Sequence, residues 1–433
     1  MRTIPVVEVG FTPSGRQGVA IGQQKRYRCT NISELLLPDL SEYEFPRDIT
    51  GSVLRLARHF PAVVVTGARQ TGKTTLLTKL FPGYQYVSLD LPAEAQLAEE
   101  DPQTFLARHP PPLLVDEVQY APKLFRYLKV EIDRNRNANG RYILTGSQKL
   151  SLMREVSDSL AGRCGVLELE ALAIHELGEV FAKRETTAGI AEVLVRGFMP
   201  QLWKDLALRP ADFFSGYQAT YLERDVRQIL NVSSLRDFDR FMRAAAVRSG
   251  QLLNKSELAK EVGISTKTIN EWLGVLEATN QITILEPYFA NVGKRLVKTP
   301  KLYFNDVGLL CFLLGLNRHV VTQTYLIGAI WETFLYGELR KYLSIEAPEA
   351  SVWFYRDQSR EVDFVIERDG HLSLAESKWK EIPAAKDFEQ AIAAHELLPL
   401  ACWPVMVFCR TRQSHPVTEN RLAVNGFKLR DHI

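Results

Sequence analysis

One short motif constrains the fold of this chain more than any other feature of its sequence. Residues 67–74 read Gly-Ala-Arg-Gln-Thr-Gly-Lys-Thr, which fits the pattern G-x-x-x-x-G-K-[ST] of a phosphate-binding loop. The motif follows an apolar run, Ala62–Thr66, and precedes a helical pattern over Thr74–Leu80. Its glycines let the backbone curl so that successive N–H groups converge on phosphate oxygens, and the helix points its positive end at the same charge. A chance match is the alternative, but chance does not supply the flanking strand and helix.

The motif predicts a site for ATP and magnesium. We expect Lys73 to reach the β and γ phosphates and the Thr74 hydroxyl to ligate Mg²⁺. The nucleotide-contacting residues expected from the loop are Gly67, Ala68, Arg69, Gln70, Thr71, Gly72, Lys73, Thr74 and Thr75.

A second motif lies downstream, where the apolar run Leu113–Asp116 ends in Asp116 and Glu117. In an open α/β sheet, ligands bind at the C-terminal ends of the strands. We expect Asp116 to hold magnesium, directly or through water, and Glu117 to orient and polarise the attacking water. An apolar run that ends in Asp-Glu is common by itself, and its distance after the phosphate-binding loop gives it this meaning.

Other residues are weaker candidates for the same site. Thr145 and Ser147 end another apolar run and are candidates for sensing the γ-phosphate, although polar residues also simply begin turns. Arg163 is a candidate arginine finger that would act on the site of a neighbouring subunit. Arg154 competes with Arg163 for that role.

The pattern around these motifs predicts an α/β fold. Short apolar runs alternate with helical stretches, which indicates a parallel sheet covered on both faces. The expected strands are Ala62–Thr66, Tyr86–Asp90, Leu113–Asp116, Tyr142–Thr145 and Val166–Leu169.

Composition excludes several classes of protein. The net charge is only +2, so any affinity for nucleic acid must come from local basic patches. The five cysteines form no C-x-x-C pair, which argues against zinc ribbons and a disulfide framework and suits a reducing cytosol. Residues 1–22 lack a signal-peptide pattern, and no run of about 18 apolar residues predicts a membrane span. We therefore expect a cytoplasmic protein without a membrane partner.

Residues 256–273 read as a helix, a turn at Gly263 and a second helix capped by Ser265, which is a helix-turn-helix pattern. Strands are expected at Ile282–Pro287 and Lys301–Phe304. The loop between these strands carries the basic residues Lys294, Arg295 and Lys298. This layout is typical of a winged helix with a basic wing, in which Lys267 and its neighbours approach a DNA groove. The alternative is that the unit packs on the ATPase as a lid or a protein contact.

A second site is predicted near the C-terminus. Asp369 and Gly370 form a strong two-residue hairpin signal. Counting back from this turn places Asp363 opposite Glu376, and strand alternation puts Lys378 on the same face as Glu376. Opposed carboxylates repel each other unless they hold a cation.

Asp363 and Glu376 are therefore candidate ligands for magnesium or manganese, and Lys378 is a candidate for activating water or stabilising charge. Glu332, on the preceding helical segment, is a further candidate. The alternatives are a solvated polar strand face or a domain that is catalytically silent. Ser377 is polar where the buried side of the strand favours an apolar residue.

With these motifs in hand, the chain resembles the AAA-type "ATP-binding proteins" of bacteria and archaea that carry a C-terminal domain of unknown function. The resemblance spans residues from about 50 to 420. The segments that carry it are 67–75, 114–119, 144–148, 161–163, 221–226, 301–309 and 360–367.

The resemblance implies an AAA-type core, a winged helix and a restriction-endonuclease-like domain of the PD-(D/E)XK type. The expected domains are an N-terminal extension (1–50), an AAA-type P-loop ATPase domain with a helical lid (51–235), a winged-helix domain (236–315) and a nuclease-like domain (316–433). It also implies a ring, such as a hexamer, acting as a motor on DNA, with branched DNA such as four-way (Holliday) junctions as the preferred substrate. The alternative is a nucleotide-switched regulatory or scaffold protein with a silent nuclease-like domain.

Overall fold

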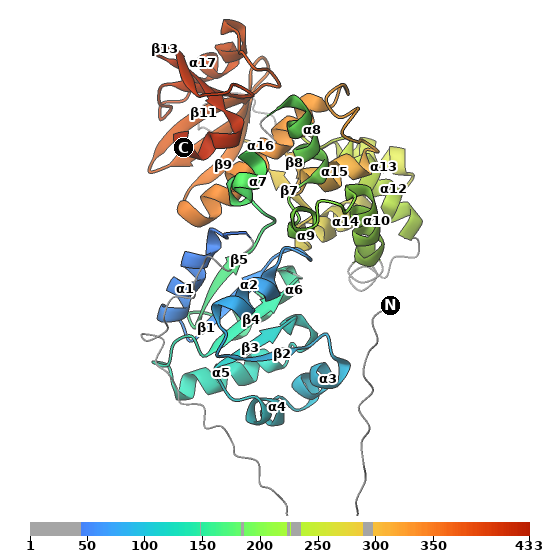
Figure 1. The fold of residues 1–433 in the computed structure, drawn as a ribbon, viewed down its shortest axis with the longest axis vertical. Coiled ribbons are helices and arrows are strands. Elements are labelled where there is room, and N and C mark those ends of the chain that lie inside the picture. The colour runs from blue at the N-terminus through green and yellow to red at the C-terminus, as the bar shows by residue number, and fades with distance from the viewer. Residues whose placement is uncertain (1–44, 148, 183–185, 223–225, 227–234, 289–297) are drawn as a thin grey trace, which may run out of the picture.

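The computed structural model describes residues 45–147, 149–182, 186–222, 226, 235–288 and 298–433. Most of the expected N-terminal extension therefore lies outside the described residues, as do Lys294 and Arg295 of the expected wing and the side chain of Arg154. Figure 1 shows one sheet with its helices in the lower half of the view. Above it lie the helices that follow this sheet in the sequence and, next to them, a second sheet near the C-terminus.

The phosphate-binding motif lies in a parallel sheet of five strands with the order β2-β3-β4-β1-β5. The strands are β1 (Ala62–Thr66), β2 (Gln85–Ser88), β3 (Leu113–Asp116), β4 (Tyr142–Gly146) and β5 (Cys164–Glu168). The interior strand β1 is valine-rich and buried along its whole length, as expected for a strand covered on both faces. The predicted α/β fold class with a parallel sheet is confirmed.

Alternate residues of β1 face two different layers of helices. Val63 and Val65 share a core with Ile49 of α1 and Leu77 of α2, whereas Val64 joins the core that contains α5. The helices of this unit are α1 (Ile49–His59), α2 (Lys73–Leu80), α3 (Pro92–Glu100), α4 (Pro102–Arg108), α5 (Leu124–Arg134) and α6 (Lys149–Ser159). Burial on both faces fixes the strand ends from which the site residues extend.

A set of helices follows the first sheet. Its members are η4 (Ile174–Leu177), α7 (Glu179–Ala182), α8 (Thr187–Arg196), α9 (Pro200–Lys204), α10 (Pro210–Tyr221), α12 (Leu235–Ala246) and α15 (Val307–Leu313). Helices α8 and α15 pack closely where Gly197 meets Gly308. A Cβ atom on Gly308 would lie 2.6 Å from the backbone nitrogen of Gly197, so this crossing requires glycine.

The expected helix-turn-helix forms from α13 (Lys255–Val262) and α14 (Thr266–Ala278). Gly263 ends α13 with a φ of 83°, a left-handed conformation that glycine adopts at no steric cost. The Ser265 hydroxyl accepts a hydrogen bond from the Thr268 N–H at 3.0 Å and caps α14. An antiparallel sheet with the order β6-β8-β7 completes the unit. Its strands are β6 (Gln251–Leu252), β7 (Ile282–Leu285) and β8 (Lys301–Phe304).

The C-terminal part opens with the long helix α16 (Ile327–Glu346) and forms a six-stranded sheet with the order β13-β14-β12-β11-β10-β9. Its other elements are β9 (Ser351–Arg356), β10 (Glu361–Arg368), β11 (His371–Ser377), η6 (Ala385–Phe388), α17 (Glu389–His395), β12 (Val405–Cys409), β13 (His415–Thr418), β14 (Arg421–Asn425) and η7 (Gly426–His432). Asp369 and Gly370 both have positive φ, and Arg368 pairs with His371. The predicted hairpin register is therefore confirmed.

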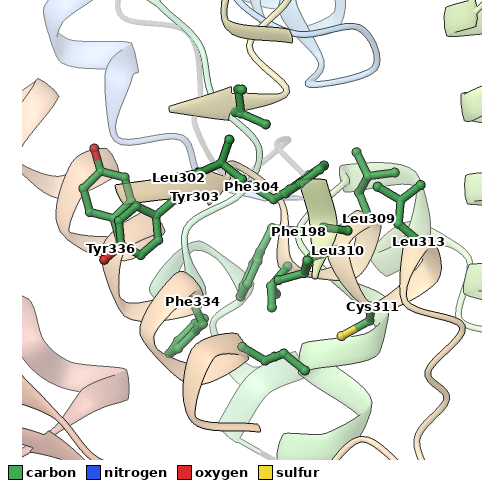
Figure 2. Packing of buried hydrophobic residues seen from close by; sticks show 14 of the residues in the cluster. Phe198, Leu302, Tyr303, Phe304, Leu309, Leu310, Cys311, Leu313, Phe334 and Tyr336 are labelled. Atoms are coloured by element: carbon green, nitrogen blue, oxygen red, sulfur yellow. The ribbon is translucent and has the colours of Figure 1, made fainter. Parts of the chain in front are cut away.

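One continuous hydrophobic core joins the middle helices, the three-stranded sheet and the C-terminal part. Figure 2 shows this junction, in which Phe198, Phe304, Leu310 and Phe334 extend from different elements toward a common interior. The core runs from Leu172 to Leu429 and so includes residues on both sides of the boundaries expected at 235 and 315.

Within the described part of the chain, we find no helix that combines the length and the apolar character needed to cross a membrane.

Candidate functional site

The phosphate-binding loop leaves β1 and enters α2 with a backbone that only glycine allows at its first position. Gly67 has a φ of 144°, and a Cβ atom there would lie 2.1 Å from the carbonyl oxygen of Leu169. The Lys73 ammonium donates to the carbonyl oxygens of Gly67 and Ala68, each at 2.9 Å. In this conformation the ammonium group of Lys73 is therefore held by the loop's own carbonyl oxygens, and its contact with β and γ phosphates stays a prediction.

Asp116 lies at the end of β3 and is surrounded by hydroxyl groups. The Thr74 hydroxyl donates to Asp116 Oδ2 at 2.7 Å, and the Tyr86 hydroxyl donates to the same oxygen at 3.0 Å. The Thr145 hydroxyl donates to the other oxygen, Oδ1. Burial, and then the Asp116 carboxylate, raise the pKa of Tyr86 above its ordinary value. Tyr86 was not identified from the sequence, because a tyrosine in a half-exposed strand carries no motif.

This arrangement fits a magnesium ion by its chemistry. A hydroxyl and a carboxylate lie within hydrogen-bond distance of each other at the mouth of a phosphate-binding loop, and oxygen ligands of these two types are those that Mg²⁺ takes beside nucleotide phosphates. Thr74 and Asp116 are the residues that would hold the ion. Thr145 lies behind Asp116 and is fully buried.

Glu117 takes a left-handed backbone conformation, with a φ of 55°, immediately after β3. The Ser147 hydroxyl donates to Glu117 Oε2 at 3.0 Å, and the Gln119 amide donates to the same oxygen. A Cβ atom on Gly146 would lie 2.6 Å from Gln119 Oε1, so only glycine at this position leaves space for the Gln119 side chain beside Glu117. The sequence predicted Glu117 and Ser147 but not Gln119, which brings the two together.

A cavity of about 860 Å³ opens in front of the loop, within the size range of small-molecule sites. Of the predicted residues, those that line it are Arg69, Gln70, Gly72, Lys73, Thr74, Thr75 and Glu117. Gly67, Ala68, Thr71, Asp116, Thr145 and Ser147 form the layer behind. The far wall comes from the middle helices and the N-terminal segment and includes Phe45, Leu172, Pro200, Phe213 and Tyr217, together with the polar residues Gln201, Lys204 and Thr220.

Arg47 joins the loop to its surroundings and also lines the cavity. Its guanidinium donates to the carbonyl oxygen of Thr71 at 2.9 Å and to that of Glu170 at 2.6 Å, and its Nε lies 3.2 Å from Glu176. No motif pointed to this residue, because it lies in the segment expected to be an irregular extension.

Arg163 lies elsewhere in this chain. Its Nε and Nη2 atoms each donate to Asp133 at 2.9 Å in a bidentate pair, and Arg163 is not among the cavity-lining residues. Hydrogen bonds from Arg163 and then from Arg136 lower the pKa of Asp133 to about 2. The role of Arg163 toward a neighbouring subunit stays a prediction.

The second predicted constellation also comes together. The last pair of β10 and β11 at this end is Phe364 with Ala375, and Asp363 and Glu376 are the next residues of the two strands. The Lys378 ammonium lies 2.7 Å from Glu376 Oε2 and 3.9 Å from Asp363 Oδ2. Asp363 also accepts a hydrogen bond from the Ser377 N–H at 2.9 Å.

Lys301, at the start of β8, reaches into this constellation from the three-stranded sheet. Its ammonium lies 2.8 Å from Glu361, 2.9 Å from Glu332 and 3.2 Å from Asp363. The Tyr303 hydroxyl donates to Glu332 at 2.6 Å. We call the whole set the C-terminal centre: Lys301, Tyr303, Glu332, Glu361, Asp363, Glu376 and Lys378.

The C-terminal centre does not fit a metal ion as it is arranged here. Lysine ammonium groups already lie within ion-pair distance of Asp363, Glu332 and Glu376. Among the described residues, no group of three or more His, Cys, Asp or Glu side chains is positioned to hold a metal ion. The sequence predicted Glu332, Asp363, Glu376 and Lys378 as neighbours. It missed Lys301, whose only signal is a charged residue in a strand that is otherwise apolar.

The helix-turn-helix leaves Lys267 exposed on α14, and Lys298 is also exposed. The rest of the expected basic wing, Lys294 and Arg295, lies outside the described residues. A role of this surface in DNA binding therefore stays a prediction.

Three family models match the chain. One described as "AAA domain" matches residues 59–178, which contain the phosphate-binding loop, Asp116 and Glu117. Two described as domains of unknown function, DUF8612 and DUF4143, match residues 187–320 and 327–426. Lys301 and the carboxylates of the C-terminal centre thus belong to regions matched by different models.

Two curated relatives cover most of the chain. They are "Uncharacterized protein Rv2008c" of Mycobacterium tuberculosis and "Uncharacterized protein Mb2031c" of Mycobacterium bovis. Each is 31% identical over 360 residues, which are 82% of this chain and 79% of the relative.

Solved structures are similar at a lower level. The Walker-type ATPase PABY2304 of Pyrococcus abyssi has a TM-score of 0.44 at 14% identity, over 65% of this chain and 99% of that one. A single-site variant of RuvB of Thermotoga maritima has a TM-score of 0.31 at 17% identity, over 55% and 89%. The ORC2 protein of Aeropyrum pernix, in its complex with ADPNP and ADP, has a TM-score of 0.31 at 15% identity, over 58% and 90%. At these TM-scores the likeness adds no argument about function.

Proposed function

This chain belongs to the family of the two mycobacterial proteins, and we propose that it is a magnesium-dependent ATP hydrolase built on an AAA-type P-loop domain. One observation carries the proposal. Thr74 and Asp116, the expected magnesium ligands, are in direct contact at 2.7 Å, and Glu117 faces the same cavity as Lys73. A carboxylate held beside the phosphate-binding lysine is the type of group that orients the attacking water in hydrolysis.

The residues of the loop would bind the triphosphate first. Lys73 would exchange its contacts with the Gly67 and Ala68 carbonyls for phosphate oxygens, and the N–H groups of the loop would turn to the same oxygens. Thr74 and Asp116 would hold magnesium, which would supply positive charge against the phosphate oxygens.

Glu117 would then act on water. A carboxylate near the γ-phosphate accepts a proton from the attacking water or orients it in line with the leaving group. Gln119 and Ser147 are positioning residues, because both donate to the same oxygen of Glu117. The apolar and aromatic wall of the cavity would receive the base, since Phe213 and Tyr217 offer ring surfaces there.

The test of hydrolysis is a steady-state rate of phosphate release with MgATP, with Lys73→Ala as the blank. The proposal expects turnover in the wild-type chain and a loss of about 10²-fold or more in the variant, the scale for removing one group that stabilises developing charge. Turnover that survives Lys73→Ala would show that the phosphate release has another source.

We further propose that the energy of hydrolysis is used on DNA, with branched DNA such as four-way junctions as the preferred form, by a ring of subunits. The helix-turn-helix supports this, because the N-terminal end of α14 presents Thr266, Lys267 and Asn270 to solvent, where a recognition helix meets a groove. Adding single-stranded, duplex and four-way-junction DNA to the same rate assay tests it. Stimulation by the junction above duplex is expected.

A nucleotide-switched regulatory or scaffold protein is the second candidate, and one observation favours it. The C-terminal centre holds lysines against its carboxylates instead of leaving them open. If no form of DNA changes the rate of ATP hydrolysis, the second candidate is favoured. A Lys267→Glu variant sharpens the choice, because it should abolish DNA stimulation and leave the rate without DNA unchanged.

A further inference from the structure

The resemblance to metal-dependent nucleases implies a divalent ion in the C-terminal part of the chain, yet the structure puts a lysine there. We propose that Lys301 is the resident cation of the C-terminal centre. Its ammonium takes the place that a divalent ion would need between Glu332, Glu361 and Asp363, and so closes the centre to metal in this conformation. This inference does not depend on ATP hydrolysis.

The first support for this proposal is the buried position of Lys301 among acidic side chains. The Lys301 residue is only 2% exposed, and three carboxylates from two elements lie within 3.2 Å of its Nζ atom. A buried ammonium is costly unless it is paired and hydrogen-bonded. Three acidic partners far exceed what a single ion pair requires, and they surround the ammonium as oxygen ligands surround a cation.

The second support for this proposal is that Lys301 and its acidic partners come from different parts of the chain. The lysine lies on β8, in the region matched by one family model, whereas its partners lie on α16 and β10, in the region matched by another. Tyr303, two residues further along β8, donates to Glu332, and its ring stacks on Tyr336 of α16 with a centroid distance of 4.4 Å. Figure 2 shows these two rings side by side. The three-stranded sheet thus inserts its cation into a neighbouring unit and fixes it there.

The charges around the lysine support it third. Besides Lys301, two cationic groups lie against the acidic side chains of the centre: Lys378 is 2.7 Å from Glu376, and Arg356 is 2.7 Å from Glu361. Without Lys301, these two cations would face four acidic side chains, and another cation would be attracted to the centre.

An oxygen is also available for such a cation. Among the described residues, Glu376 Oε1 is one of the few buried side-chain oxygens without a hydrogen-bond partner. Glu376 is 4% exposed, and its other oxygen contacts Lys378. The centre therefore keeps acidic residues of the type that bind metal, while the Lys301 ammonium occupies the space between Glu332, Glu361 and Asp363.

The experiment compares thermal unfolding of variants in EDTA and in MnCl₂, without nucleotide. Lys301→Met should lower the unfolding temperature by roughly 10 °C, and saturating Mn²⁺ should restore roughly half of the loss. Lys301→Met combined with Asp363→Asn should not respond to Mn²⁺. The matched control is Lys341→Met, which removes another buried lysine that pairs with Glu338 at 2.9 Å. It should lose stability without any recovery in Mn²⁺.

The proposal is overturned if Mn²⁺ raises the unfolding temperature of the wild-type chain and Asp363→Asn removes that rise, because the centre then takes metal with Lys301 in place. It is overturned equally if Lys301→Met and Lys341→Met respond alike to Mn²⁺, since Lys301 is then an ordinary buried ion pair. If Lys301→Met does not fold, the same measurements are made on Lys301→Gln, whose amide can still donate to a carboxylate. The wild-type and Asp363→Asn pair decides the question in either case.

Discussion

Two acidic sites in this chain differ in the groups that satisfy their carboxylates. In the ATP site, the oxygens of Asp116 and Glu117 accept hydrogen bonds from neutral hydroxyl and amide groups. In the C-terminal centre, Asp363 and Glu376 face lysine ammonium groups. A hydroxyl donor leaves the negative charge in place for an incoming cation, whereas an ammonium cancels it. The sites contain similar acids, but they differ in whether a charged group already occupies the position beside them.

The two sites also differ in how they are assembled. The ATP site gathers residues from the ends of β1, β3 and β4, which a parallel sheet places at one edge. The C-terminal centre needs β8 of one unit to meet α16 and β10 of another. The first arrangement persists as long as the sheet does, and the second depends on how two units pack.

The largest effect is expected for Glu117→Gln in the ATP site. The change keeps the hydrogen-bonding shape of the side chain but removes its ability to accept a proton, so phosphate release should fall by about 10²–10⁴-fold. ATP binding, measured with a fluorescent analogue, should be retained. Glu100→Gln, on the exposed end of α3, is the control and should hydrolyse ATP at the wild-type rate. Equal rates for Glu117→Gln and wild type would remove Glu117 from the reaction.

The next largest effect is the loss of stability when a carboxylate loses an ammonium partner instead of a hydroxyl partner. Lys301→Met leaves buried carboxylates unpaired and should lower the free energy of unfolding by about 3–5 kcal/mol at pH 7. Thr74→Val removes a single hydroxyl donor from Asp116 and should cost about 1 kcal/mol. Urea unfolding without nucleotide and metal measures both. If the two losses are equal, the ammonium is not the main partner of the C-terminal carboxylates.

Thr145→Val tests whether the residue behind Asp116 is structural. Thr145 donates to Asp116 and accepts from the Glu117 N–H, and it is fully buried. Its loss should cost about 1–3 kcal/mol of unfolding free energy. The affinity for ADP should change little, because Thr145 does not line the cavity. A variant with full stability but weak binding of an ATP analogue would restore Thr145 as a γ-phosphate sensor.

The last effect is the pH dependence of stability. Burial, and then Asp363, raise the pKa of Glu332 to about 7 and that of Glu376 to about 8. The folded chain therefore binds these protons more tightly than the unfolded chain, and this stabilisation is full below about pH 4.5 and lost as pH rises through 7 to 8. We expect the unfolding free energy to fall between pH 5.5 and 8.5.

A double variant, Glu332→Gln with Glu376→Gln, should show a weaker decline over the same pH range. Glu100→Gln should keep the wild-type slope. Urea unfolding at a series of pH values measures all three proteins, and identical slopes would mean that these two carboxyls do not hold their protons in the folded chain.

Features set by neighbours in the sequence could be predicted from it. The strand, loop and helix around Lys73 follow from local pattern, and the register of Asp363 opposite Glu376 follows from the turn at Asp369 and Gly370. In each case, a short stretch of chain fixes the geometry before any long-range packing occurs.

Features set by packing could not be predicted in this way. Arg47 reaches Glu176 across 129 positions of sequence, and Lys301 reaches Asp363 across 62. No periodicity or motif links such partners, because only the tertiary fold brings them together. Lys301 shows the consequence, since the sequence alone places Lys378 beside the C-terminal acids but not Lys301.

The most direct test of the contrast between the two sites is the stoichiometry of bound Mn²⁺, measured by electron paramagnetic resonance with and without a non-hydrolysable ATP analogue. We predict a single tightly bound Mn²⁺ per chain, present only with the analogue, lost in Lys73→Ala and kept in Asp363→Asn. Tightly bound Mn²⁺ without nucleotide that Asp363→Asn removes would contradict this prediction, because the C-terminal centre would then be open to metal.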